Sequence, residues 1–347
     1  MEHTLPGLRA RPLTDADVPA WAALLRRAEP VDRPRYRWTE EDLAEDLHAE
    51  GLDPARHSTG GFDGDGELRA AGLVGLRAGD VQHLRLFLAG VVDPAHRRRG
   101  VGSALLRWGA DVARERAAQR RAELGPVPAW LWCTVEEHRA DLAALCAAHG
   151  LRVLRWFATM HRDLRPGAEP PVPAAPAVPD GYRLLALAGA ARELGVDPGE
   201  LDERLRAAHA EAFADHWMSQ PLTREDWRTR VTGHREARPD WSRVAVRVGG
   251  PQHGEVAGYA LAYAHVADWE GLGFPVADLG SLGVRRPHRR AGLARALLGA
   301  VALAARADGM AAVSLEVDSE NPSGAVGLYE SAGYRTVHRH AVQALPV

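Results

Sequence analysis

Arg286-Pro287-His288-Arg289-Arg290-Ala291-Gly292-Leu293-Ala294 follows an apolar run and opens an Ala- and Leu-rich segment. The same pattern occurs earlier in the chain, at Asp93-Pro94-Ala95-His96-Arg97-Arg98-Arg99-Gly100-Val101-Gly102. In such a turn the backbone N–H groups and the positive end of the following helix converge on one anion. One copy alone would also suit a solvated basic turn. Two copies in equivalent strand–turn–helix settings predict that the protein holds a nucleotide-type pyrophosphate.

The residues expected to form this anion site belong to the two turns. The Arg side chains supply charge, and the backbone amides depend on the geometry of the turn. The later turn contributes Arg289, Arg290, Ala291, Gly292, Leu293 and Ala294, and the earlier turn contributes Val92, Arg97, Arg98, Arg99, Gly100, Val101 and Gly102.

The composition indicates an ordinary globular protein of two domains. The chain has 347 residues, of which 46% are apolar and 26% charged, with a formal net charge of -3. This charge gives no reason to expect nucleic acid or an anionic membrane as a partner. Two cysteines, Cys133 and Cys146, are too few for a disulfide framework and lack metal-ligand spacing. With no apolar leader and no long apolar stretch, we expect a cytoplasmic protein without a metal.

A Pro-rich stretch separates the two copies of the pattern. Residues 166–179 contain Pro-Gly-Ala-Glu-Pro-Pro-Val-Pro-Ala-Ala-Pro-Ala-Val-Pro, which can neither pack a core nor sustain a helix. We therefore expect domains at 1–165 and 180–347, joined by a semi-rigid linker at 166–179.

Periodicity and capping signals predict the same order of elements in both halves. The first half has expected strands at 8–12, two within 60–79, 81–92, 130–135 and 151–164, with helices at 14–27, from 39, from 100 and at 139–148. The second half has expected strands at 182–187, a hairpin at 243–265, 276–284, 311–317 and 334–342, with helices at 201–212, 223–232, 292–307 and 322–332. Alternating strands and helices with hairpins make each half an α/β domain.

The later turn is followed by a second motif, Glu316-Val317-Asp318-Ser319-Glu320-Asn321-Pro322-Ser323-Gly324-Ala325-Val326-Gly327-Leu328-Tyr329-Glu330-Ser331-Ala332-Gly333-Tyr334. Together the two motifs resemble the GNAT superfamily of acyl-CoA-dependent N-acyltransferases, in a tandem arrangement. The resemblance implies two GNAT-like domains, each a mixed, mostly antiparallel sheet whose two central parallel strands splay apart. It also implies that acetyl-CoA or another acyl-CoA is the acyl donor.

The resemblance implies roles for individual residues of the second half. Asp278 lies where the family commonly has a carboxylate base, and Tyr329 where its tyrosine protonates the leaving thiolate. The backbone N–H groups near Leu282 and Val284 would polarise the thioester carbonyl. Asn321 would bind the pantetheine arm, although Asn before Pro is also a good helix cap. Asp278 as a turn-capping residue and Tyr329 as a packed aromatic are the structural alternatives.

Counting the same numbers of residues from the corresponding glycines of the first half leads to neither a carboxylate base nor a tyrosine acid. Leu86 stands in place of Asp278, Cys146 in place of Tyr329, and His138 in place of Asn321. His83 and Cys146 are possible substitutes, but a buried strand histidine and a small buried cysteine are the simpler interpretations. We expect this half to be catalytically degenerate while its phosphate turn retains the ability to bind CoA.

The amine acceptor is expected over the loops of the second half that contain His216, Trp217 and Trp269. Aromatic walls would suit a cationic amine, whereas both tryptophans could simply cover the core. The favoured function is transfer of a short acyl group to a primary amine of a small molecule or peptide. An acyl-CoA-binding or interaction protein without activity is the alternative from another class, and the sequence does not indicate an oligomeric state.

Overall fold

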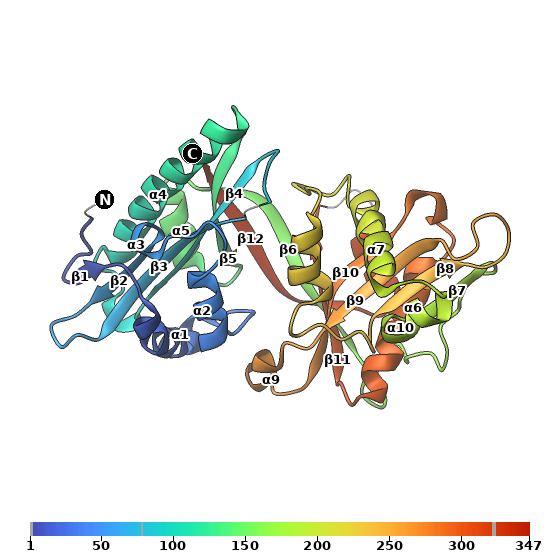
Figure 1. The fold of residues 1–347 in the computed structure, drawn as a ribbon. Helices are drawn as coiled ribbons and strands as arrows, with labels where there is room; N and C mark the ends of the chain where they lie inside the picture. The colour runs from blue at the N-terminus through green and yellow to red at the C-terminus, as the bar shows by residue number, and fades with distance from the viewer. Residues whose placement is uncertain (1–2, 78, 321–323) are drawn as a thin grey trace. The chain divides into compact units, whose positions relative to one another are not determined.

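The structure is a computed structural model that describes residues 3–77, 79–320 and 324–347 (Figure 1). The chain divides into two compact units, Met1–Trp156 with Arg339–Val347, and Phe157–His338. Each unit is an α/β fold with helices on both faces of a mixed sheet. The predicted fold class is confirmed in both halves.

The first unit is built on six strands in the order β1-β2-β3-β4-β5-β12. The strands are β1 (Arg9–Arg11), β2 (Ser58–Phe62), β3 (Leu68–Leu76), β4 (Leu84–Val92), β5 (Ala129–Glu136) and the last part of β12 (Arg335–Pro346). The helices are η1 (Asp15–Asp17), α1 (Val18–Asp32), α2 (Glu40–Leu47), α3 (Pro54–His57), η2 (Pro94–His96), α4 (Val101–Leu124) and α5 (Ala140–Ala148).

The second unit repeats this plan with the strand order β7-β8-β9-β10-β11-β6. Its strands are the part of β6 (Arg152–Asp163) from Phe157 onward, β7 (Tyr182–Ala186), β8 (Arg243–Arg247), β9 (Val256–Tyr263), β10 (Val276–Val284) and β11 (Ala312–Asp318). Its helices are α6 (Leu187–Leu194), α7 (Pro198–Ala212), α8 (Arg224–Trp227), η3 (Arg228–Thr232), α9 (Val266–Leu272), η4 (Arg286–His288), α10 (Leu293–Ala307) and α11 (Ala325–Ser331).

Each sheet has a single parallel pair near its centre, β4 with β5 and β10 with β11. The pairing joins Leu84–Phe87 to 129–132 and Val276–Leu279 to 312–315. Both β4 and β10 continue beyond these residues, and within the described chain no further pair joins them to their parallel neighbour. The central strands therefore separate at their C-terminal ends, as the resemblance implied.

The last strand of each half joins the sheet of the other half's unit. Residues 340–346 of β12 pair antiparallel with 130–136 of β5 in the first unit. Residues 157–163 of β6 pair antiparallel with 312–318 of β11 in the second unit. The boundaries of the compact units therefore differ from the expected domains at 1–165 and 180–347. The reason is that each last strand joins the sheet with which it pairs, and this pairing does not follow the order of the sequence.

The Pro-rich segment 166–179 belongs to the second unit. It contains neither helix nor strand, with a turn at 166–167 and bends at 169–170 and 174–175, and Arg162 donates a hydrogen bond to the Pro171 carbonyl at 3.1 Å. Val172 packs against the core, and Pro179 lies next to Gly292, where an added Cβ would stand 3.6 Å from Pro179 Cγ. The segment is irregular, with no helix, and it packs against the second unit.

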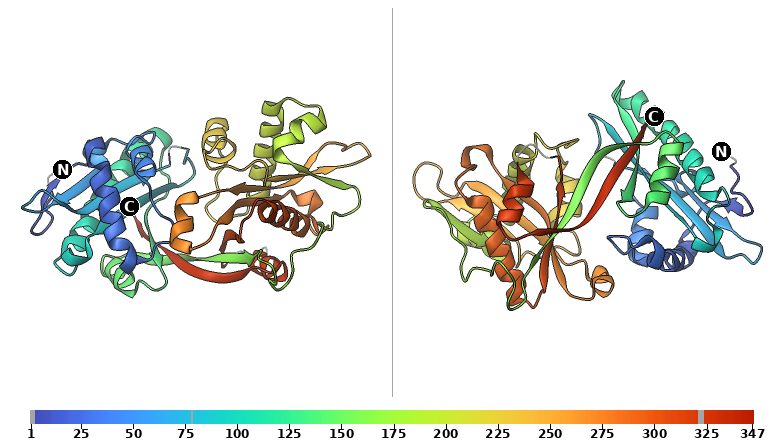
Figure 2. Two further views of the ribbon diagram at one scale, coloured as in Figure 1. Left: turned by 90° about the horizontal axis from the view of Figure 1, so that it is seen from below. Right: turned by 180° about the vertical axis from the view of Figure 1, so that it is seen from behind.

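Apolar alternation along the strands buries a separate core on each face of each sheet. In the second unit, α10 covers one face with residues such as Leu293 and Leu297, whereas α6, α7 and α8 cover the other with Leu201 and Trp227 (Figure 2). Tyr259, Leu261 and Tyr263 of β9 point to the α6–α8 face, and the alternate residues Ala260 and Ala262 to the α10 face.

Most predicted elements are present with ends shifted by a few residues. The capping signals at Thr14 and Thr39 both form capping boxes, and Gly100 and Gly292 are the N-cap residues of α4 and α10. The sequence analysis missed α3, α6 and α9, which are short helices. Part of the expected helix at 223–232 is the single π-helical turn η3.

Candidate active site

A β-bulge shapes the central strand of the second unit where the parallel strands part. The register between β10 and β9 shifts between Leu279 and Ser281, which leaves Gly280 as the extra residue. Asp278 pairs with Tyr263 and Ser281 with Leu261, so both belong to the α6–α8 face. Without the bulge, residues three apart would point to opposite faces of the strand.

Asp278 is a partly buried carboxylate surrounded by groups that titrate. Its side chain is 13% exposed, and its Oδ2 lies 3.8 Å from His265 Nε2. Nδ1 of the same imidazole contacts Glu236 Oε2 at 2.6 Å. Burial raises the pKa of Tyr263 to about 12, and the charge of Asp278 adds to this rise. An acidic side chain at this point can accept a proton from a cationic amine.

Tyr329 lies on α11 and packs against the core on the α10 face. Burial raises the pKa of Tyr329 to about 12, which keeps the hydroxyl protonated at neutral pH. Leu282 and Val284 of β10 pack against the same core, so this face brings together three of the predicted site residues. The Tyr334 ring stands 5.9 Å from the Tyr329 ring, and burial, with smaller effects from Tyr329 and Asp278, raises its pKa.

The later phosphate turn has the backbone that an anion site needs. Arg290 and Gly292 adopt positive φ angles of 63° and 88°. Within the described residues no side chain caps the start of α10, so its first N–H groups remain available to a ligand. Arg289 is held by hydrogen bonds of 3.1 Å to the carbonyls of Val284 and Ala212. Arg290, Ala291 and Gly292 are exposed, and these residues fit a pyrophosphate.

The earlier turn has the same backbone conformation, but its first arginine, Arg97, makes more contacts within the protein than Arg289 does in the later turn. Arg98 and Gly100 have φ angles of 63° and 84°, matching the later turn. Arg97 donates to the Val92 carbonyl at 3.0 Å and makes two bonds of 2.7 and 2.8 Å to the Asp32 carboxylate. Arg139 contacts the same carboxylate. Arg98 and Arg99 are exposed and are the side chains that a bound anion can reach.

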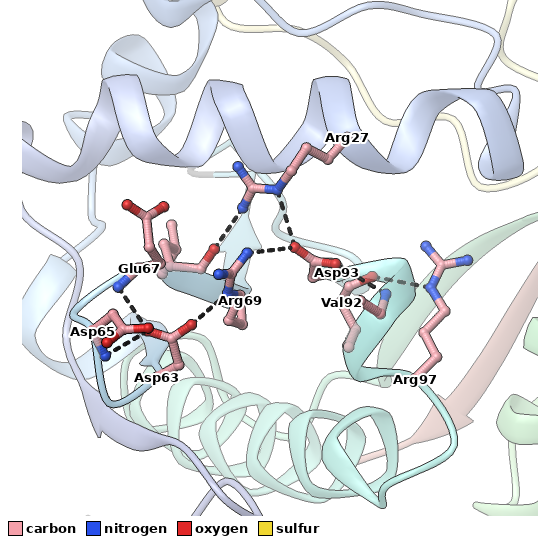
Figure 3. A network of polar contacts seen from close by, with 10 residues as sticks. Arg27, Asp63, Asp65, Glu67, Arg69, Val92, Asp93 and Arg97 are labelled. Atoms are coloured by element: carbon pink, nitrogen blue, oxygen red, sulfur yellow. Dashed lines mark hydrogen bonds and ion pairs between the residues drawn. The ribbon is translucent and has the colours of Figure 1, made fainter.

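Asp93 anchors the start of this turn (Figure 3). Its carboxylate is buried and accepts hydrogen bonds from Arg27 at 3.0 Å, Arg69 at 3.2 Å and the Ala95 N–H at 3.0 Å. Burial alone would raise the pKa of Asp93, but these three donors outweigh it and lower the pKa. The network fixes the strand end from which the turn departs.

In the second unit an arginine takes the place of this aspartate, and its partners are carboxylates instead of arginines. Arg285 stands at the position of Asp93 relative to the turn, and it contacts the carboxylates of Glu211, at 2.6 Å, and Glu255. Glu211 also accepts the Arg286 N–H at 3.0 Å. Each half therefore ties its turn to a helix and a strand segment by ion pairs, although the residues involved share no sequence pattern.

The first unit lacks the other features of the second. Its β3–β4 register is continuous from residue 70 to residue 76, without a bulge. Leu86, at the position of Asp278, is fully buried, and Cys146 is fully buried in a small apolar cluster with Cys133. The geometry therefore offers neither a carboxylate nor a tyrosine at the places where the second half has them.

The predicted substrate residues have different surroundings. Trp269 donates its indole N–H to the Val276 carbonyl at 2.9 Å and packs against the core, which favours a structural role. His216 contacts the Trp217 carbonyl at 3.2 Å. The loop that carries both is tied to the later turn by Asp215, which accepts bonds of 2.7 and 2.8 Å from Arg286. Asn321 lies outside the described residues.

Several polar residues of this region were not predicted from the sequence. They are Glu236 and His265, next to Asp278, and a second series in which His209 contacts the Tyr259 hydroxyl at 2.6 Å and Tyr259 contacts Ser281 at 3.1 Å. Burial lowers the pKa of His209 to about 4. The sequence signal that could have indicated this region is Gly280, because a glycine inside a predicted strand suggests a β-bulge.

The described residues form neither a metal cluster nor a membrane-spanning helix. Over the described ranges 3–77, 79–320 and 324–347, no group of three or more His, Cys, Asp or Glu residues has the arrangement of a metal site. In the same part of the chain, no helix is both long enough and apolar enough to cross a membrane.

Comparisons with known proteins agree with this geometry. The model of the Acetyltransferase (GNAT) family matches residues 19–129 and 203–334. Mycothiol acetyltransferase of Thermomonospora curvata is 31% identical over 74% of this chain and 71% of its own length. The protein of the same name from Thermobispora bispora is 31% identical over 70% of each chain.

Solved structures show the same tandem fold. A GCN5-related N-acetyltransferase from Sphaerobacter thermophilus aligns with a TM-score of 0.73 at 28% identity, over 99% of this chain and 97% of its own. A tandem GNAT protein of the clavulanic acid biosynthesis pathway aligns with a TM-score of 0.64 at 20% identity, over 98% of both chains. The chain belongs to the GNAT acetyltransferase family and contains two GNAT domains in tandem. It is thus an acyl-CoA-dependent N-acyltransferase.

Proposed function

We propose that the protein transfers an acetyl group from acetyl-CoA to the primary amine of a small molecule or peptide, and that the chemistry occurs in the C-terminal half. The observation that carries this proposal is the asymmetry between the halves. Both have the phosphate turn, but only the second combines a bulged central strand with Asp278 on one face and Tyr329 packed on the other.

The proposed mechanism is direct attack of the amine in a ternary complex. Asp278 takes a proton from the ammonium form of the acceptor, and the free amine attacks the thioester carbonyl. The N–H groups near Leu282 and Val284, on the strand segment that has separated from β11, stabilise the oxyanion that develops. Tyr329, protonated because of its raised pKa, donates a proton to the departing thiolate, and the proton that the attacking nitrogen loses as the amide forms restores the tyrosine hydroxyl.

Binding of the donor is assigned to the turns. Acetyl-CoA supplies the activated acyl group, and the exposed residues Arg290, Ala291 and Gly292 with the start of α10 hold its pyrophosphate. Asn321 is proposed to contact the pantetheine arm. His216 and Trp217, on the loop tied to the turn by Asp215, are proposed to contact the acceptor. The earlier turn is proposed to bind CoA without turnover.

An assay of thiol release from acetyl-CoA, run with a panel of primary amines, tests this function. We expect release that depends on the amine and yields its N-acetyl derivative. Hydrolysis at the same rate with and without each amine would contradict the proposal.

Mycothiol acetyltransferase is a second candidate for the particular activity. The curated relatives of that name support it, at 31% identity over most of the chain. The loops with His216 and Trp217 show no feature specific to a thiol-bearing sugar. Acetylation of a cysteinyl pseudodisaccharide at a kcat/KM at least about a hundredfold above simple amines would establish this candidate, since that ratio reflects specific recognition in the transition state.

A further inference from the structure

A carboxylate–imidazole–carboxylate series runs to Asp278 from the end of β9. His265 places Nδ1 2.6 Å from Glu236 Oε2 and Nε2 3.8 Å from Asp278 Oδ2. The side chains of Glu236, His265 and Asp278 are 23%, 28% and 13% exposed, so Asp278 is the most buried of the three. All three belong to the second unit.

Backbone pairing and ring packing fix this arrangement. The Ala264 N–H donates to the Glu236 carbonyl at 2.9 Å, which places Glu236 beside the end of β9. The His265 ring stacks on Tyr263, with centroids 6.1 Å apart and planes inclined by 9°. Tyr263 is in turn the cross-strand partner of Asp278. The imidazole is therefore held between the two carboxylates by residues of three separate segments.

The contact with Glu236 determines which nitrogen carries hydrogen. An ionised carboxylate can only accept, so Nδ1 of His265 is the donor. In a neutral imidazole the other nitrogen, Nε2, then has a lone pair, and Nε2 is the atom that faces Asp278. Glu236 orients the ring and stabilises positive charge on it.

We propose that the proton acceptor of the reaction is the Asp278–His265 pair, with His265 as a positioning residue oriented by Glu236. This inference rests on the proposed function, because His265 acts through Asp278. Asp278 Oδ2 takes the proton as the N–H bond of the ammonium breaks. Because Oδ2 and Nε2 are 3.8 Å apart, beyond hydrogen-bond distance, the proton passes through one water: the O–H bond breaks as the water takes the proton and Nε2–H forms as the water gives one up, which leaves Asp278 ionised and His265 as an imidazolium against Glu236. The imidazolium returns its proton to solvent after acyl transfer.

Three further titratable groups face this pair. The His234 ring stands 6.4 Å from the His265 ring, edge to face, and its Nδ1 accepts the Glu236 N–H at 3.3 Å. Tyr263 donates its hydroxyl to the Val231 carbonyl at 3.1 Å. Tyr334 is buried on the opposite face near Asp278. The two tyrosines stay protonated over the working range because burial raises both pKa values. His234 is the second histidine beside this pair and therefore serves as the comparison for His265 in the test that follows.

The first test uses His265→Asn, because the Asn amide can still donate to Glu236 from the place of Nδ1 but offers no base to Asp278. With glycinamide as the acceptor, we expect kcat/KM to fall about tenfold at neutral pH and to recover as pH approaches the amine's own titration. The acid limb that the wild type shows should be replaced in this variant by the limb of the amine itself at higher pH, and the wild-type limb should persist in His234→Asn. His253→Gln is the matched control, since His253 is an exposed histidine of the same unit whose ring accepts only the Gly249 N–H at 3.1 Å. A wild-type acid limb that persists in His265→Asn, or a loss that is equal at all pH values, overturns the relay.

Glu236→Gln tests the orientation of the ring. Without the carboxylate charge the imidazolium is less stable, so the acid limb should move to lower pH while the affinity for acetyl-CoA, measured by calorimetry, stays unchanged. A long-range 1H–15N spectrum of protein labelled at the histidine rings gives a readout independent of activity. We expect His265 as the neutral Nδ1–H tautomer at pH 8. An Nε2–H tautomer, or an imidazolium that persists at pH 8, would exclude the proposed lone pair.

Asp278→Asn separates failure of this inference from failure of the proposed function. If Asp278→Asn keeps wild-type activity, the proposed base is wrong and the relay falls with it. If Asp278→Asn is inactive at neutral pH while His265→Asn behaves as wild type, only the relay is overturned.

Discussion

At the scale of single residues, Tyr329 gives the first prediction. Tyr329→Phe should lower kcat at least roughly tenfold with little change in acetyl-CoA affinity, because it removes only the proton delivered to the thiolate. Since the pKa of Tyr329 is raised to about 12, the wild-type rate should not fall through its ionisation between pH 7 and 10. Steady-state kinetics and calorimetry measure both quantities. Cys146→Ala is the control, because Cys146 is buried in the first unit, and a larger effect from it would reverse the assignment of the working half.

The proposed base gives a second prediction with a distinct pH signature. Asp278→Asn should reduce activity most at neutral pH and recover as pH rises toward the titration of the acceptor amine, since a free amine needs no base. A pH–rate profile with one simple amine measures this. Equal loss at every pH would instead identify Asp278 as a structural residue of the bulge.

How far these residues could be predicted depends on whether they belong to a local motif. The family resemblance suggests Asp278 from its distance to Gly292 and Tyr329 from its place in the second motif, and both roles remain proposals. Glu236 and His265 reach Asp278 only because β9 and β10 pair and Ala264 bonds back to Glu236. No spacing in the sequence encodes that contact. Trp269 was expected to contact the acceptor from its place in a loop of the second half, whereas its indole N–H donates to the Val276 carbonyl.

At the scale of elements, the two turns provide a matched pair of substitutions. Gly292→Glu and Gly100→Glu impose equal backbone strain, because both glycines have φ near +85° and both face a proline Cγ at 3.6 Å. Gly292→Glu should abolish turnover by placing a negative charge at the pyrophosphate site. Gly100→Glu should empty the first site and leave turnover intact.

Calorimetric titration with CoA, run beside the activity assay, distinguishes the outcomes for the two turns. A single site in the wild type that only Gly292→Glu removes would show that the earlier turn no longer binds CoA. Lost turnover in Gly100→Glu, with folding and the second site intact, would show that the first half takes part in catalysis.

Helices and strands could be predicted where the apolar periodicity and the capping signals are strong. Features that depend on contacts between distant segments could not. The strand at Val276–Val284 was predicted with both its ends, whereas the bulge within it required the pairing with β9. The ion pairs that hold Asp93 and Arg285 could not be predicted from the sequence either. In each case the partners belong to a helix and to a strand region that are distant in the chain.

At the scale of the whole molecule, the exchange of last strands predicts an unusual effect of truncation. Removing residues 339–347 should destabilise the first unit, although they follow the second in sequence. Their loss leaves β5 without the partner that pairs with residues 130–136 and exposes apolar surface such as Leu131. Hydrogen exchange should show faster exchange in 129–136 than in β10. Faster exchange in β10 alone would contradict the predicted effect.

The strand exchange also bears on how such a chain can evolve. A tandem repeat usually arises by duplication of one gene segment, and either copy could later be lost or transferred by recombination. Here a breakpoint at the Pro-rich segment would separate both strands from their sheets, because β6 lies before the segment and pairs with β11 after it, while β12 lies after the segment and pairs with β5 before it. The first half can therefore lose its chemistry and still be retained by selection, because the strand that closes the other half's sheet is encoded within it.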